Sequence, residues 1–240
     1  MTGNHSITRD PLYYIVVGFF AALTTGLPAI MGQPRFLPFI QTLALTIFVI
    51  IPLHQNYRRG ALKVMAIWLP IQFILLTLLS SLFLAQLEHA FTNGFAYRGD
   101  ITAWFFGGAP HPTGLLQQPV TFVIELAGVI LGTLVSAGFV GTWFLIRLIN
   151  QSAYSTGILL GALDSPAQAL LVIPYWSLIR AAGYAGLVIL CAQPLLTYNW
   201  SPSYYWQTQR KLIVYSILLV LLGILLELFL PSLVARPPVP

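Results

Sequence analysis

Apolar residues occupy long blocks of the chain, separated by short polar segments. A bilayer core of roughly 30 Å takes about 20 residues of helix. Six blocks meet that length: Pro11–Ile30, Phe36–Leu53, Val64–Leu87, Pro119–Leu148, Pro174–Leu196 and Leu212–Leu230. They lack the alternation of polar and apolar residues that strands of a membrane barrel show. The pattern predicts an all-α polytopic bundle of about six transmembrane helices, forming one domain over residues 1–240.

The stretch Thr156–Tyr175 leaves the number of helices open. Its apolar part, Gly157–Leu163, is too short to span a bilayer, and Asp164-Ser165-Pro166 has the form of a helix start with Asp164 as the N-cap. We therefore favour an interfacial turn that leads into the span beginning at Pro174. The alternative takes Gly157–Trp176 as a complete seventh span.

The longest connection between spans is Glu88–Gln118, where we expect one interfacial segment. Asp100 is placed to cap a short helix, Ile101–Phe106, whose aromatic side chains would lie among the lipid headgroups. The glycine- and proline-rich segment Gly107–Gly114 then interrupts any helix. A re-entrant segment that lines a pathway is the alternative.

Composition supports membrane embedding. Hydrophobic residues make up 58% of the chain and charged residues 7%, against about 25% charged in soluble domains. The net charge of +5 would suit nucleic-acid binding in a soluble chain, but no basic run exceeds two residues. We expect the lipid bilayer as the surroundings and no nucleic-acid partner. The single cysteine, Cys191, excludes an intramolecular disulfide.

The distribution of basic residues predicts the orientation. The connection His54–Lys63 is the most basic one and should be cytoplasmic. With six helices, both termini then lie in the cytoplasm of a multi-pass cell-membrane protein. The aromatic segment Thr197–Lys211 would lie at the outer membrane interface.

Charged side chains inside spans cost about 2.5–3.5 kcal/mol each at a helix centre, so they are candidate functional sites. Arg180 and Glu227 lie near the start of one span and the end of its antiparallel neighbour, which predicts an ion pair near the cytoplasmic face. Glu125 lies about 9 Å from the outer end of its span, alone at its depth. It is either a proton- or cation-binding carboxylate or a hydrogen-bonded structural residue. Arg147 and Asp164 would complete the cytoplasmic rim.

Small residues recur every four positions on two helix faces, a spacing typical of close helix packing in membranes. One face carries Gly128, Gly132 and Ser136, and the other carries Gly157 and Gly161. We expect these faces to pack within the bundle, or else against a second copy or a partner membrane subunit.

Sequence motifs for enzymatic chemistry are absent from the chain. No histidine lies inside a span and no H-E-x-x-H occurs, so we expect neither a metal site nor a cofactor. No nucleophile motif or phosphate-binding loop occurs either, which argues against an enzyme.

Two kinds of non-catalytic membrane protein remain. The first is a small permease, or the membrane subunit of a transporter, for an ion or small solute, supported by proline-interrupted spans and by acidic groups at membrane depth. The alternative is a membrane organiser, acting in assembly, trafficking or scaffolding, that binds partner helices through its small-residue faces.

One segment bears on the organiser hypothesis. The sequence TWFLIRLI (Thr142–Ile149), a small polar turn and LVIPYW (Leu171–Trp176) together resemble the core of bacterial Yip-domain membrane proteins. In this chain Asn150-Gln151-Ser152 replaces the glycine-pair turn of that family. The resemblance covers about a quarter of the chain, and no functional residue is transferred from it.

Overall fold

The structure is a computed structural model that describes residues 7–163 and 166–235. Within these ranges the chain is helical and contains no strand. Five helices are long and apolar enough to cross a membrane, namely α1 (Pro11–Met31), α2 (Phe36–His54), α3 (Arg58–Leu82), α9 (Tyr175–Thr197) and α10 (Pro202–Val234). Five of the six expected spans are thereby confirmed as long helices, although α10 begins ten residues before the expected Leu212.

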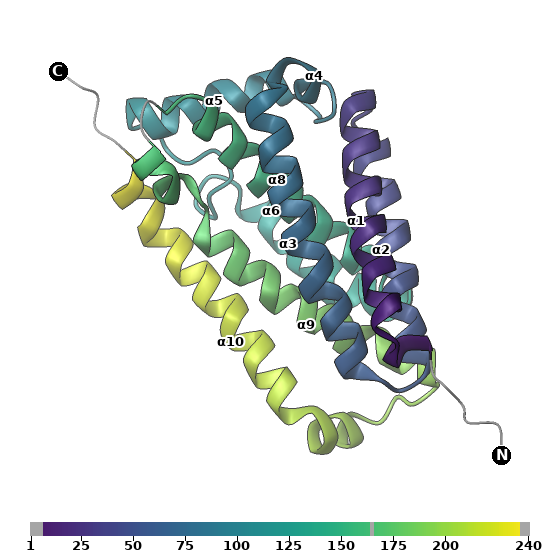
Figure 1. The fold of residues 1–240 in the computed structure, drawn as a ribbon. Helices are drawn as coiled ribbons and strands as arrows, with labels where there is room; N and C mark the ends of the chain where they lie inside the picture. The colour runs from purple at the N-terminus through teal and green to yellow at the C-terminus, as the bar shows by residue number, and fades with distance from the viewer. Residues whose placement is uncertain (1–6, 164–165, 236–240) are drawn as a thin grey trace.

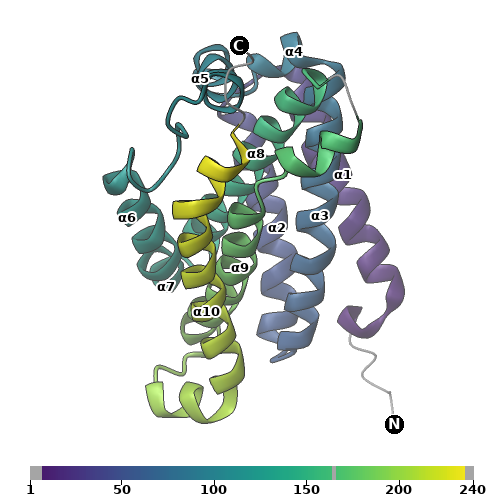
Figure 2. The ribbon, with the colours of Figure 1, turned by 90° about the vertical axis from the view of Figure 1, so that its left-hand side faces the viewer.

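The helices form an elongated bundle (Figures 1 and 2). Helices α1, α2 and α3 lie together on one side and the antiparallel pair α9 and α10 on the other, with α8 (Phe139–Gly161) packed against both groups. Short helix α4 (Leu84–Glu88) and helix α5 (Gly94–Gly107) lie across one end of the bundle, which we call the α5 end. Here α1 finishes and α9 begins.

Helix α5 differs from the expected short helix. It begins at Gly94, seven residues earlier than Ile101, so Asp100 lies inside the helix and does not cap it. Asn93, in the left-handed conformation, takes the N-cap position. The side chains of Trp104 and Phe105 are buried because they pack onto the end of the bundle, whereas Phe106 is exposed.

The expected single span Pro119–Leu148 is wrong. The structure has α6 (Pro119–Ala127), a π-helical turn (Gly128–Gly132) and α7 (Thr133–Val135), after which the chain reverses into α8. The reversal occurs where Ala137 and Gly138 adopt positive φ angles of 52° and 102°. The Ser136 hydroxyl oxygen accepts a hydrogen bond from the Val140 N–H (2.9 Å) and so caps the start of α8.

Glycines hold the two arms of this helical hairpin together. A Cβ atom at Gly128 would lie 2.0 Å from the Phe144 ring, and one at Gly132 would lie 2.4 Å from a Val140 methyl group. Gly157 in α8 meets α3 in the same way, with Ser80 Cβ 2.4 Å from the added atom, and Gly161 faces Ser81. The four glycines therefore lie against other parts of the same chain, whereas Ser136 lies in the turn and not on a helix face.

Gly138 provides a test of the hairpin. Gly138→Ala should lower the free energy of unfolding by about 1–3 kcal/mol, because the left-handed backbone disfavours a Cβ atom and that atom would lie 3.3 Å from Ala192 Cβ. Gly99→Ala is the matched control, since nothing lies within 4 Å of its added Cβ. Chemical denaturation in detergent measures both. Equal effects of the two substitutions would contradict the observed reversal.

Because the chain reverses at Gly138, the start of α1 and the end of α10 do not lie on the same side of the bundle. The hairpin enters and leaves at the α5 end, so α1 begins and α10 ends at opposite ends of the bundle (Figure 1). The six-helix prediction placed both on one side. The seven-helix alternative is not observed either, because α8 ends at Gly161 and a 3-10 helix, Pro166–Val172, leads into α9. Asp164, the expected N-cap, lies outside the described residues.

Candidate functional site

Arg180 contacts two carboxylates inside the bundle. Its Nη1 donates a hydrogen bond to Glu227 Oε2, and its Nε lies 3.8 Å from Glu125 Oε1. The Arg180 side chain is 5% exposed, Glu227 2% and Glu125 18%. The expected pair of Arg180 and Glu227 is confirmed as a contact. We call these three residues the charge cluster.

The expectation that Glu125 stands alone is wrong, and the hairpin explains why. Because α6 starts at the same end as α9, Glu125 and Arg180 each lie five or six residues, or roughly 8–9 Å, inside that end. Glu227 lies seven residues before the end of α10, at similar depth. The charge cluster is therefore near the α5 end, and not near the end that carries the basic His54–Lys63 connection.

Aromatic groups and a glycine surround the charge cluster. The Phe122 ring lies beneath the Arg180 guanidinium, 5.2 Å from its centre, at cation–π distance. Gly223 allows α10 to approach, since a Cβ there would lie 2.7 Å from Arg180 Cβ. Arg180 Nε, Glu125 Oε1 and the Tyr184 hydroxyl are buried without a geometrically acceptable hydrogen bond. A buried polar atom without a hydrogen bond is costly and calls for an explanation.

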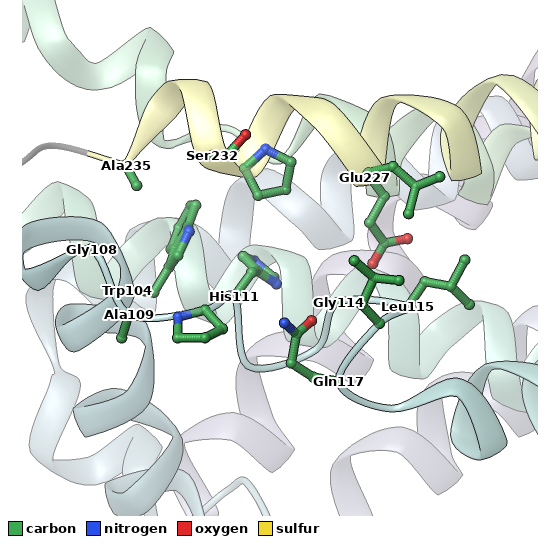
Figure 3. Close-up of a pocket in the computed structure, with 14 residues that line it drawn as sticks. Trp104, Gly108, Ala109, His111, Gly114, Leu115, Gln117, Glu227, Ser232 and Ala235 are labelled. Atoms are coloured by element: carbon green, nitrogen blue, oxygen red, sulfur yellow. The ribbon is translucent and has the colours of Figure 1, made fainter.

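Two cavities meet at the charge cluster. The inner cavity, of about 100 Å³, is bordered by Glu125 and Arg180 and has mostly polar walls from α5, the 108–118 connection, α6, α8 and α9. The lateral pocket, of about 520 Å³, is bordered by Glu227. Figure 3 shows Glu227 pointing from α10 towards the connection that carries His111 and Gln117. The charge cluster therefore lies between the inner cavity and the lateral pocket.

His111 lines both of these cavities. Its ring makes edge contacts with Trp104 and Trp176, at centroid distances of 4.5 and 5.7 Å. Burial, with a smaller contribution from the Arg180 charge, lowers the pKa of His111 to about 4. The imidazole is therefore neutral at pH 7 and adds no charge to the site.

A third cavity, which we call the vestibule, adjoins the inner cavity. It has a volume of about 570 Å³ and is lined by Arg35 and Asp100 among others. Tyr97, Arg147 and Gln151 line both the vestibule and the inner cavity. The exposed side chain of Arg147 therefore borders both spaces, and is not part of the cytoplasmic rim that the sequence predicted.

A chain of buried amides crosses the bundle beside the vestibule. Trp68 Nε1 donates to Gln72 Oε1 (3.0 Å), and Gln72 Nε2 donates to Asn150 Oδ1 (2.7 Å). Asn150 Nδ2 donates to Gln41 Oε1 (2.7 Å), whose Nε2 donates to Thr25 Oγ1 (3.0 Å). This amide chain joins α3, α8, α2 and α1, and the three amide residues are nearly inaccessible.

Sequence reasoning missed the amide chain because it considered only charged residues as costly. A signal was present: Gln41 and Gln72 are single amides within strongly apolar helices, and an uncharged polar group in lipid also requires a partner. No group of three or more potential metal ligands occurs in residues 7–163 and 166–235.

Comparisons of the chain with protein-family models, with curated proteins and with solved structures find no match. The resemblance to Yip-domain proteins gains no support from them. Functional inference therefore depends on the residues and their geometry.

Proposed function

We propose that the chain is an integral membrane protein with five crossings and one re-entrant hairpin. Large apolar side chains are exposed along the outer faces of the long helices, as with Phe19, Ile74 and Leu221, which lipid would cover. The hairpin α6–α8 enters and returns at the α5 end, and its irregular turn packs against α9 at the buried Gly138, whereas Ser136 and Ala137 are partly exposed. Non-helical backbone at membrane depth is tolerated where protein covers it.

The charges at the two ends of the bundle support this placement. Among the described residues, the end where α1 begins carries six cations and one carboxylate, namely Arg9, Arg58, Arg59, Lys63, Arg210, Lys211 and Asp10. The α5 end carries Arg35, Arg98, Glu88 and Asp100. By the positive-inside rule the basic end faces the cytoplasm. This puts the start of α1 inside and the end of α10 outside, which replaces the expectation of two cytoplasmic termini.

Within this membrane protein, the charge cluster supports a permease for a small solute. Ionisable residues inside a membrane are costly and commonly mark pathways for ions or solutes. Transporters often place their substrate and ion sites beside discontinuous helices. Here the charge cluster lies next to a broken helix and between two cavities, and this is the observation that carries the proposal.

Proton coupling follows from the charge balance of the cluster. Within the charge cluster one arginine faces two carboxylates, an excess of one negative charge in a low-dielectric interior, and the further cation Arg147 borders the same inner cavity as Glu125. Glu125 is the more exposed carboxylate, lies farther from Arg180 and borders the inner cavity. We therefore assign Glu125 as the group that takes up and releases a proton while solute passes, and Glu227 as the permanent partner of Arg180.

The organiser hypothesis loses its main support. It depended on small-residue faces free to bind partner helices, and Gly128, Gly132 and Gly157 are occupied by contacts within the chain. A co-purification experiment distinguishes between an autonomous permease and a transporter subunit. A stable stoichiometric partner, such as a nucleotide-binding subunit, would indicate the subunit.

Proteoliposomes filled with a pH-sensitive dye test the permease proposal. Small carboxylates, amines, sugars and inorganic ions, added one at a time, should include a solute that drives protein-dependent proton entry. Glu125→Gln should reduce this entry at least about tenfold and leave the free energy of unfolding nearly unchanged, since the bond between Arg180 and Glu227 persists. Arg210→Gln, a surface arginine at the far end, is the control. Fluxes equal to those of empty liposomes, or full activity of Glu125→Gln, would refute the proposal.

A further inference from the structure

Two arginines that line the vestibule form no close ion pair with a carboxylate of the described residues. Arg35, in the turn between α1 and α2, and Arg147, in α8, both line it. Ion pairs within the part of the chain that the structure describes involve neither of them. Asp100 is the one acidic side chain among the described lining residues. The guanidinium group presents several donors in a plane that matches the oxygens of carboxylate and phosphate, so the vestibule offers donors to an anion.

An apolar groove continues from the vestibule along the outside of the bundle. This side groove, of about 800 Å³, is lined by Met31, Phe36, Phe39 and Trp143, with Arg35 and Gln33 also lining it. Arg35 and Trp143 border both the side groove and the vestibule. Phe36 and Phe39 are 41% and 45% exposed. The vestibule, whose mixed walls carry two cations, thus adjoins the apolar side groove.

We infer that the vestibule and side groove together bind an amphipathic anion. Its carboxylate or phosphate head lies between Arg35 and Arg147, and its apolar body lies along Trp143 in the side groove. The vestibule volume falls within the range of small-molecule sites, about 300–1,000 Å³. Two unpaired cations at the end of the apolar groove favour an anion over an amine or a neutral amphiphile. The binding site itself does not depend on the proposed function. The further statement that the bound anion is the transported solute rests on that function.

Calorimetry on protein in phosphatidylcholine nanodiscs tests the site, with empty nanodiscs correcting for partition into lipid. Octanoate supplies both head and body, acetate and inorganic phosphate supply the head alone, and octylammonium supplies the body with the opposite charge. Octanoate should bind saturably, and acetate and phosphate at least about tenfold more weakly. Octylammonium should give no heat beyond that of the empty nanodiscs. Saturable octylammonium binding as tight as that of octanoate would overturn the inference.

Substitutions of the lining residues test whether octanoate binds in the vestibule and side groove. Arg147→Gln should weaken octanoate binding at least about tenfold, Arg147→Lys should retain part of the affinity, and Arg210→Gln should leave it unchanged. Trp143→Ala should weaken octanoate and leave acetate unaffected. If Arg147→Gln fails to fold, Arg35→Gln carries the same test, because Arg35 is an exposed turn residue. Unchanged octanoate affinity in the folded arginine variants would place the anion elsewhere and refute the site.

Two further experiments identify the source of the anion and distinguish the binding site from the permease proposal. In nanodiscs that contain phosphatidylglycerol, a lipid occupant would suppress octanoate binding, whereas a site for free carboxylates would keep it. Saturable octanoate binding without any transport would uphold the site and refute the permease. Proton-coupled transport of another solute without octanoate binding would uphold the permease and refute the site.

Discussion

Arg180→Met should lower the free energy of unfolding by about 3–5 kcal/mol, the usual cost of removing one partner from a buried ionic group. The substitution removes the cation that forms ion pairs with both Glu125 and Glu227 in the bundle. Proton-coupled flux in liposomes should be lost as well. Reversible unfolding in detergent measures the stability effect. A loss below about 1 kcal/mol would mean that the Arg180 charge contributes little to the fold.

Variants that change the whole charge cluster separate stability from function. The triple variant Arg180→Met, Glu125→Gln, Glu227→Leu should recover most of the lost stability, because apolar replacement of a complete buried ionic group is often neutral or favourable. It should remain inactive in transport. Exchanging Arg180 and Glu227 should restore stability well only when Glu125→Gln is added, since the carboxylate introduced at position 180 would otherwise face Glu125. Full recovery by the double exchange alone would exclude Glu125 from the cluster.

Asn150→Leu should cost about 2–6 kcal/mol. Asn150 accepts from Gln72 and donates to Gln41, so leucine leaves two buried amide groups unsatisfied, at about 1–3 kcal/mol each. Gln207→Leu is the matched control, because this amide is exposed at the start of α10 and should tolerate the change within about 0.5 kcal/mol. The same unfolding measurement covers both. Similar effects at the two positions would show that the amide chain does not hold the four helices together.

Helix positions could be predicted from the sequence wherever an apolar block has clear limits. Helix α1 starts at Pro11 behind the cap Asp10, whose carboxylate accepts from Leu12 N, and it ends before Gly32 in the left-handed conformation. The contact between Arg180 and Glu227 followed from matched depth on antiparallel neighbours, an argument that holds whichever way the bundle is oriented.

The hairpin could not be predicted in this way. Residues Pro119–Leu148 form one predominantly apolar block, and glycine is common in membrane helices, so Gly138 gives no sign in the sequence that the chain reverses there. Because the reversal was missed, Arg180 and Glu227 were assigned to the cytoplasmic end, and Glu125, assigned to the outer end, was separated from them. The amide chain was missed for a different reason. Its members come from four helices, and their pairing depends on the packing of α8 between α2 and α3.

Cysteine labelling from each side of the membrane tests the proposed topology most directly. In a Cys191→Ser background, single cysteines replace the exposed residues His54, Gly107, Ser203 and Ser232, and intact cells are treated with a membrane-impermeant maleimide before and after permeabilisation. The account predicts that positions 107 and 232 react in intact cells, and that positions 54 and 203 react only after permeabilisation. Reaction of position 203 in intact cells, with position 232 protected, would restore six full crossings and contradict the re-entrant hairpin.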